Sequence, residues 1–228
     1  MAHRDLIVAN TLVVPGLGGA GPDHWLSWLE SQVPGASRID HDEWDDPVLA
    51  RWAGRVKQAI DRSSRPVWLI GHGFGCLAAI MAAADRADHV AGALLVAPAD
   101  PERFSADGVR VTQDDSRMRY PSISAVLPQS PLDFTTLVVA RTDDPWMRLT
   151  TASLWAERWG SGLVLAGKLG NIDTDTLRGP WPQCLRLLRV LQNAQGDLPL
   201  GEMVGQQEPV KRRHGLLAKL RRQSRATL

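Results

Sequence analysis

The stretch Ile70-Gly71-His72-Gly73-Phe74-Gly75-Cys76 decides the fold of this chain. Its glycine spacing matches the G-x-S-x-G turn, in which a tight bend from a buried strand into a helix holds a serine above the sheet in a strained backbone conformation. Here the central position is Gly73. Glycine adopts a positive φ without the steric cost that serine incurs, so the exchange relaxes about 1 to 3 kcal/mol of strain and removes the reactive oxygen. The sequence therefore predicts the turn without its nucleophile.

The residues on either side of this stretch support that interpretation. Residues 66–70 form a short apolar run that is typical of a buried parallel strand. Residues 76–84 are rich in helix formers, so the order of strand, turn and helix is the one that the motif requires. An unrelated tight turn stays open as the alternative. A dinucleotide-binding loop is disfavoured, because the third glycine is out of register and no ribose-binding acid follows at the usual distance.

Strand and helix patterns alternate along the rest of the chain. Strands are expected over residues 6–14, 37–40, 66–70, 90–97, 136–141 and 163–166. Helices are expected from about Asp23, from Pro47, over 76–84, over 147–159 and from 179–180 to about 195. This alternation predicts an α/β fold with a mostly parallel central sheet and helices on both faces. One domain spans 1–195, and the long connection 98–135 is expected to be either a lid or a passive insert.

Composition favours one globular domain in a reducing compartment. The chain has 228 residues, of which 44% are hydrophobic and 22% charged, enough to bury one large core. Cys76 and Cys184 stand in stretches that indicate buried helices, so we expect reduced core thiols and a cytoplasmic location. Neither a signal peptide nor an apolar run long enough to span a bilayer is recognisable. Most of the nine tryptophans are expected to fill core volume.

The end of the chain has a different electrostatic character. The net charge is +1, yet residues 211–228 contain seven Lys or Arg and no acidic residue. We interpret 196–228 as a linker and a basic tail. The tail would suit an acidic protein partner or an anionic surface, and a solvated tail without a partner is the alternative.

Several motifs together resemble one hydrolase family. They are residues 13–18 (VVPGLG) with 21–25 (GPDHW), residues 70–72 (IGH) and residues 142–145 (TDDP). These segments resemble the retinoblastoma-binding-protein-nine or YdeN family of small α/β hydrolases, over residues 5 to about 192. The resemblance implies the α/β-hydrolase fold and a serine hydrolase that cleaves carboxylic ester or amide bonds with the triad order serine, acid, histidine.

The same resemblance assigns the catalytic positions, and two of the three lack the required side chain. Gly73 stands for the serine, Asp144 (or Asp143) for the acid, and Asn171 for the histidine. Because glycine offers no attacking atom and an amide cannot shuttle a proton near neutral pH, the serine mechanism is expected to be lost. A binding module for a partner or a small acyl or carbonyl ligand is the preferred hypothesis. The alternative is an active ester or amide hydrolase with a non-standard nucleophile or an activated water.

The backbone N–H groups of an oxyanion hole do not depend on the missing catalytic side chains. The N–H of Phe74 and those of the loop that contains Leu17 and Gly18 would form the oxyanion hole that the resemblance implies. Asp23 and His24 follow that loop, where they could meet a ligand or activate a water, although a helix cap and a surface histidine are the simpler interpretation.

Other candidate groups are weaker. His72 is a poor candidate for a base, and Cys76 is better explained as a core thiol than as a nucleophile. The acidic residues of 42–46 could hold a metal, but a solvated loop is favoured, and no metal or cofactor is expected.

Overall fold

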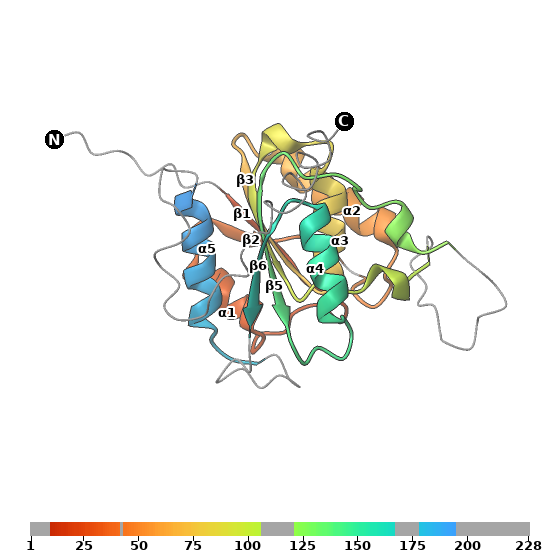
Figure 1. The fold of residues 1–228 in the computed structure, drawn as a ribbon. Coiled ribbons are helices and arrows are strands. Elements are labelled where there is room, and N and C mark those ends of the chain that lie inside the picture. The colour runs from red at the N-terminus through yellow and green to blue at the C-terminus, as the bar shows by residue number, and fades with distance from the viewer. Residues whose placement is uncertain (1–9, 42, 106–120, 167–177, 195–228) are drawn as a thin grey trace, which may run out of the picture. The chain divides into compact units, whose positions relative to one another are not determined.

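Six parallel strands form one sheet in the part of the chain that the structure describes (Figure 1). The computed structural model describes residues 10–41, 43–105, 121–166 and 178–194. The strand order is β2-β1-β3-β4-β5-β6, and every neighbouring pair is parallel. The strands are β1 (Thr11–Val14), β2 (Ala36–Arg38), β3 (Val67–His72), β4 (Val90–Val96), β5 (Thr135–Arg141) and β6 (Gly162–Ala166).

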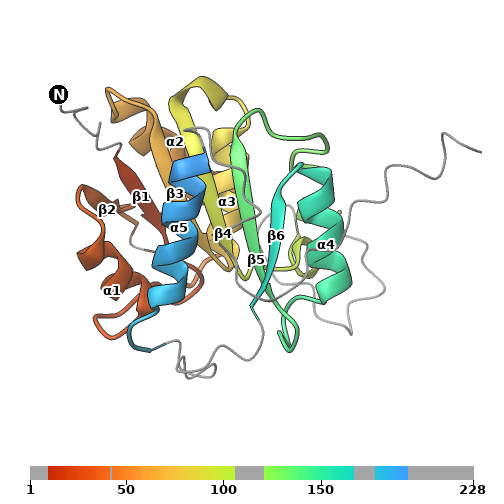
Figure 2. The ribbon, with the colours of Figure 1, turned by 60° about the vertical axis from the view of Figure 1, so that its left-hand side comes forward.

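Helices cover both faces of this sheet. One face carries α2 (Leu49–Arg62), α3 (Phe74–Ala83) and α4 (Leu149–Arg158), and the other carries α1 (Trp25–Gln32) and α5 (Pro182–Ala194) (Figures 1 and 2). Three short 3-10 helices, η1 (Ala87–His89), η2 (Pro101–Arg103) and η3 (Ile123–Ala125), lie in the connections. Two cores follow from this layering, one on each side of the sheet.

Strand β3 shows how the sequence fills both cores. Its side chains alternate, so that Val67 and Leu69 pack under α2 and α3, while Trp68 and Ile70 pack on the side of α1 and α5. A strand that is buried on both faces needs apolar side chains at successive positions, which explains the apolar run of residues 66–70.

Helices α2 and α3 differ in how much of their surface is buried, as their sequences predict. Helix α3 is almost entirely buried, as its alanine-rich sequence allows. Helix α2 buries one stripe at helical spacing, formed by Leu49, Trp52, Ala53, Val56 and Ile60.

The strand order indicates where on the sheet a ligand site is expected. Strand β1 leads through α1 to β2 on one side, and the chain then returns to β3 on the other side of β1. In parallel α/β sheets, ligands bind outside the carboxyl ends of the strands at the point where the order reverses. The loops after β1 and β3 meet at this point. They contain the glycine-rich segment after β1 and the glycine turn around Gly73, the two motifs described above.

The predicted α/β fold is confirmed, with small differences at the helix starts. Helix α3 begins at Phe74 rather than Cys76, because Gly73 is its N-cap. Helix α2 begins at Leu49 instead of Pro47, and α5 begins with Pro182, a residue suited to the first helical position. Residues 6–9 and the predicted linker and tail, 196–228, lie outside the described residues.

The long connection 98–135 is partly built into the core. Its described flanks bury Phe104, Ile123, Leu127 and Phe134, and a β-bridge pairs Ser105 with Ser122. These flanks therefore form part of the packing on the α3 side. Residues 106–120, where a lid would lie, fall outside the described residues.

Cysteines and tryptophans behave largely as expected. Cys76 and Cys184 are free and buried, so the predicted core thiols are confirmed. Six tryptophans are buried: Trp25, Trp52, Trp68, Trp155, Trp159 and Trp181. Trp146 is the exception, with 54% of its surface exposed. In the described part of the chain, no helix combines the length and apolar character needed to cross a membrane.

Candidate functional site at the carboxyl edge of the sheet

Three glycines build the turn between β3 and α3, for two different reasons. A Cβ on Gly71 would lie 2.8 Å from the Cα of Cys76, and one on Gly75 would lie 2.2 Å from the carbonyl oxygen of Pro15. These two positions exclude any side chain by close approach of backbone. Gly73 has φ 54° and ψ −124°, but a Cβ there would meet only the Cα of Gly16, at 3.6 Å. Glycine at position 73 therefore relieves the strain of this backbone conformation, and the space for a side chain is open.

The loop after β4 holds this turn from both sides. The N–H of Gly73 donates to the carbonyl of Val96 at 3.1 Å, and the N–H of Ala99 donates to the carbonyl of Gly73 at 3.0 Å. Between them, Ala97 has φ 44° and is the one non-glycine residue with positive φ among the described residues. Such strain persists only where surrounding contacts enforce it, and it concentrates at functional sites. No pattern in the sequence marked Ala97.

The glycine loop after β1 faces the turn. The N–H of Gly18 donates to the carbonyl of Trp44 at 3.2 Å, so this amide is already engaged. The N–H groups of Leu17 and Phe74 have no hydrogen-bond partner among the described residues. Phe74 is the first residue of α3, where the amide has no partner within the helix. Of the three predicted oxyanion donors, Leu17 and Phe74 therefore keep an N–H group that no described residue accepts.

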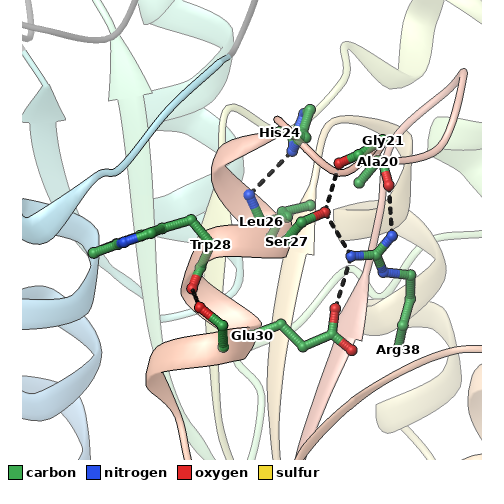
Figure 3. A network of polar contacts seen from close by, with 9 residues as sticks. Ala20, Gly21, His24, Leu26, Ser27, Trp28, Glu30 and Arg38 are labelled. Carbon is green, nitrogen blue, oxygen red and sulfur yellow. Dashed lines mark hydrogen bonds and ion pairs between the residues drawn. The ribbon is translucent and has the colours of Figure 1, made fainter.

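His24 lies at the start of α1, next to this loop (Figure 3). It is half-buried, and its Nδ1 accepts a hydrogen bond from the N–H of Leu26 at 3.1 Å, so His24 itself is the N-cap of the helix. Burial, and then the charge of Arg38, lower the pKa of His24 to about 4. Asp23 is exposed, and its carbonyl accepts from the N–H of Gly179 at 2.9 Å. The simpler interpretation of a surface histidine is thus replaced by a neutral, capping imidazole.

Arg38, at the end of β2, ties the glycine loop to α1 (Figure 3). Its guanidinium donates to the carbonyl of Ala20, to the Oγ of Ser27 at 2.8 Å and to the carboxylate of Glu30 at 2.7 Å. The Oγ of Ser27 in turn donates to the carbonyl of Gly21 at 2.6 Å. Arg38 is not among the predicted site residues, since one arginine after a short strand carries no distinguishing signal.

His72 closes the strand below the turn. Its ring lies 5.4 Å from that of His24 and 5.6 Å, edge to face, from that of Trp25, measured between ring centroids. Its Nδ1 is buried and has no hydrogen-bond partner within the described parts of the chain. Burial, and then the neighbouring His24, lower the pKa of His72 to about 3. Both imidazoles are therefore neutral at physiological pH.

Asp144 lies on the turn after β5, at the same edge of the sheet. Its Oδ1 accepts hydrogen bonds from the N–H groups of Trp146 at 2.8 Å and Met147 at 3.3 Å, so the carboxylate stabilises its own turn. Asp143 forms an ion pair with Arg141 at 3.2 Å. Asn171, the position predicted to replace the histidine, lies outside the described residues.

The weaker candidates have structural explanations. Cys76 is buried, its Sγ donates to the carbonyl of Val96 at 3.4 Å, and burial raises the pKa of its thiol, which disfavours the reactive thiolate. Glu43 and Asp46 both form ion pairs with Arg51. Over the described ranges, no three His, Cys, Asp or Glu side chains are grouped in a way that could hold a metal ion.

The chain is similar to known proteins over most of its length. Residues 11–190 match the family model described as serine hydrolase. The chain belongs to the serine hydrolase family. A YdeN-like hydrolase from Pectobacterium atrosepticum is 34% identical, with a TM-score of 0.68 over 82% of this chain and 91% of that chain. No curated protein sequence matches.

Solved structures with lower sequence identity share the fold of this chain. The ydeN gene product of B. subtilis is 14% identical, with a TM-score of 0.57 over 80% of this chain and 98% of that chain. Est1E from Butyrivibrio proteoclasticus, with ferulic acid bound, is 13% identical, with a TM-score of 0.56 over 82% and 88%. The resemblance inferred from the motifs is confirmed at the level of the family, and the roles of Gly73, Asp144 and Asn171 stay predictions.

Proposed function

We propose that this member of the serine hydrolase family does not use the serine mechanism, and that it binds a small acyl or carbonyl ligand at the carboxyl edge of the sheet. The observation that carries the proposal is Gly73. It keeps the strained turn conformation of a nucleophile, with room for a side chain, but presents no atom that could attack.

The acid–base part of a triad also lacks support. A triad needs an imidazole that accepts the nucleophile's proton and a carboxylate that orients this imidazole. The Oδ1 of Asp144 instead accepts from two backbone amides of its own turn. Asn171 has an amide side chain, which does not titrate. Loss of the nucleophile or the base from a triad costs about a millionfold in turnover.

Binding needs fewer groups than catalysis. The N–H groups of Leu17 and Phe74 are backbone donors and do not depend on the missing side chains. Donors of this kind bind a carbonyl oxygen or an anion in a site that excludes water. The loop after β4 fixes the Phe74 amide by hydrogen bonding on both sides of Gly73, so the donor is pre-positioned for a ligand.

Activity assays on the full chain test the first half of the proposal. The native chain, the Gly73→Ser variant and the Gly73→Ser, Asn171→His double variant would each be treated with a fluorophosphonate probe and a panel of p-nitrophenyl esters. The native chain is expected to show neither labelling nor turnover, and the double variant is the matched positive control, because it restores both missing side chains.

One result would overturn the proposal. Turnover by the native chain that disappears in Asp144→Ala or His24→Ala would establish an active hydrolase that uses an activated water or another nucleophile. Intact mass measurement after incubation with the probe identifies any labelled residue.

A further inference from the structure

We propose that β6 is an interaction surface through which two copies of this chain form a dimer. Strand β6 is an outer strand of the sheet, next to β5, and β2 forms the other edge (Figure 2). The dimer would not depend on the proposed ligand, because none of the residues described in the ligand site belongs to β6. Three features of β6 support it: its backbone pairing, its side chains and their order along the strand.

One side of β6 offers backbone groups for pairing. All five residues of the strand pair with β5, from Gly162 with Leu137 to Ala166 with Arg141. The other side of an edge strand presents a row of N–H and C=O groups that can pair with another chain. Within the described ranges, no residue donates to or accepts from that side of β6.

The two edges of the sheet differ in how well they are protected against association. Edge strands avoid pairing with another chain when they are short or carry charged residues or proline. Strand β2 has only three residues and ends with Arg38. Strand β6 has five residues, Gly-Leu-Val-Leu-Ala, with neither a charge nor a proline among them. Strand β6 is therefore the less protected edge.

Two leucines of β6 are exposed on one face of the sheet. Leu163 and Leu165 each keep 37% of their surface accessible. Their partners in β5, Val138 and Ala140, belong to the core under α2, α3 and α4, so both leucines lie on that face. Val164 lies on the opposite face and packs against the core of α1 and α5. A second strand beside β6 would cover part of this apolar surface, which is favourable.

The order of the side chains makes β6 complementary to a second copy of itself. In an antiparallel pair with a two-fold axis at Val164, this residue lies opposite its own equivalent. Leu163 then lies opposite Leu165 of the second copy, and Gly162 lies opposite Ala166. Leucine therefore meets leucine and a small residue meets a small residue, with no like charges opposed within the strands. Such a two-fold contact closes, so the assembly ends at the dimer.

Helix α4 leaves room for this pairing. It packs on β5 and β6 from one face of the sheet (Figures 1 and 2). Because neighbouring strands are about 4.8 Å apart, a helix centred over β5 and β6 would lie about 10 Å from its equivalent in the second copy. Packed helices typically lie about 8 to 10 Å apart. The two α4 helices would therefore pack side by side without a clash.

Sedimentation velocity of the full chain at rising protein concentration measures the association. We expect a dimer that dissociates on dilution, since the contact is small. Leu163→Lys and Leu165→Lys each place a charge on the edge and should raise the dissociation constant about tenfold or more. Val126→Lys is the matched control, because Val126 is an apolar residue outside β6 with 49% of its surface exposed, and the dimer should not change. Melting temperatures show whether each variant is folded.

Cysteine cross-linking tests the position of the two-fold axis. Directly opposite residues of an antiparallel pair have Cα atoms about 4.5 to 5.5 Å apart, which a disulfide can span, so Val164→Cys should cross-link under mild oxidation. Leu163→Cys is the control, because its equivalent lies on the diagonal, about 7 to 8 Å away, which is too far. Cys76 and Cys184 are buried, so the native chain should not cross-link.

Three results would overturn the proposal. A chain that stays monomeric at every concentration would exclude the dimer. A dimer that persists unchanged in Leu163→Lys and Leu165→Lys would exclude β6 as its interface. Cross-linking of Leu163→Cys as readily as Val164→Cys would refute the axis at Val164. None of these results bears on the proposed loss of the serine mechanism, which the labelling and turnover assays test separately.

Discussion

The three glycines of the turn should respond to the same small substitution in different ways. Gly73→Ala adds a Cβ that meets only the Cα of Gly16, at the ordinary contact distance of 3.6 Å. Its cost is therefore conformational, about 1 to 3 kcal/mol for a non-glycine residue in this region of φ and ψ. For a domain of this size, the melting temperature should fall by about 2 to 12 °C.

Gly75→Ala should be far more damaging. Its Cβ would lie 2.2 Å from the carbonyl oxygen of Pro15 and 2.4 Å from that of Val14, and backbone atoms cannot rotate away as a flexible side chain can. We expect a loss of more than about 4 kcal/mol, enough to prevent folding of a marginally stable domain. Gly54→Ala is the control. It lies in α2 with nothing within 4 Å of the added atom, and it should stabilise the chain by about 0.4 to 1 kcal/mol.

Thermal and urea unfolding, followed by circular dichroism and tryptophan fluorescence, measure all three variants. A Gly73→Ala chain as stable as the native one would show that position 73 does not hold a positive φ. A Gly75→Ala chain that loses less stability than Gly73→Ala would show that the loop after β1 does not pack against α3. Either result would refute the described turn.

Three further measurements test other parts of the structure. Asp144→Ala should cost about 1 kcal/mol in urea unfolding, because two backbone amides lose their acceptor, whereas Asp144→Asn should cost less; equal losses would contradict that role. The pKa of His72 is lowered from 6.5 to about 3, so below pH 6.5 the unfolded chain binds a proton that the folded chain refuses. The free energy of unfolding should be insensitive to this group above pH 6.5 and should fall toward pH 3 by up to about 1.4 kcal/mol per pH unit, a slope that His72→Gln should reduce. Iodoacetamide should modify Cys76 and Cys184 only after unfolding, and mass spectra that show labelling of the native chain would contradict their burial.

The sequence predicts the fold well because its signals are local and consistent. The apolar run of β3, the glycines of the turn and the alanine-rich α3 each indicate one local structure, and the alternation of strands and helices along the chain predicts a parallel sheet with helices on both faces. The errors lie at helix starts, where a cap decides the boundary. Gly73 caps α3 and Val48 precedes α2, and apolar periodicity does not register either of them.

The site is less predictable because its groups come together only through the fold. The pattern after β1 directs attention to His24, but a sequence does not reveal that its Nδ1 caps α1 or that Arg38 lies beside it. Gly18 illustrates the opposite error. It belongs to the loop that the motif identifies, yet its amide is bonded to Trp44, a residue 26 positions further along the chain. Hydrogen bonds between distant segments carry no local signature.

The backbone around Gly73 has a consequence for how homologues are compared. Its N–H and C=O are both bonded to the segment that follows β4, and the strained Ala97 lies between those two partners. Main-chain hydrogen bonds are made by every residue type except that proline lacks the donor, so a mutation at this position leaves the bend in place. Superposition of Cα traces will therefore not reveal whether a homologue carries a nucleophile at this position, and the side chain itself has to be compared.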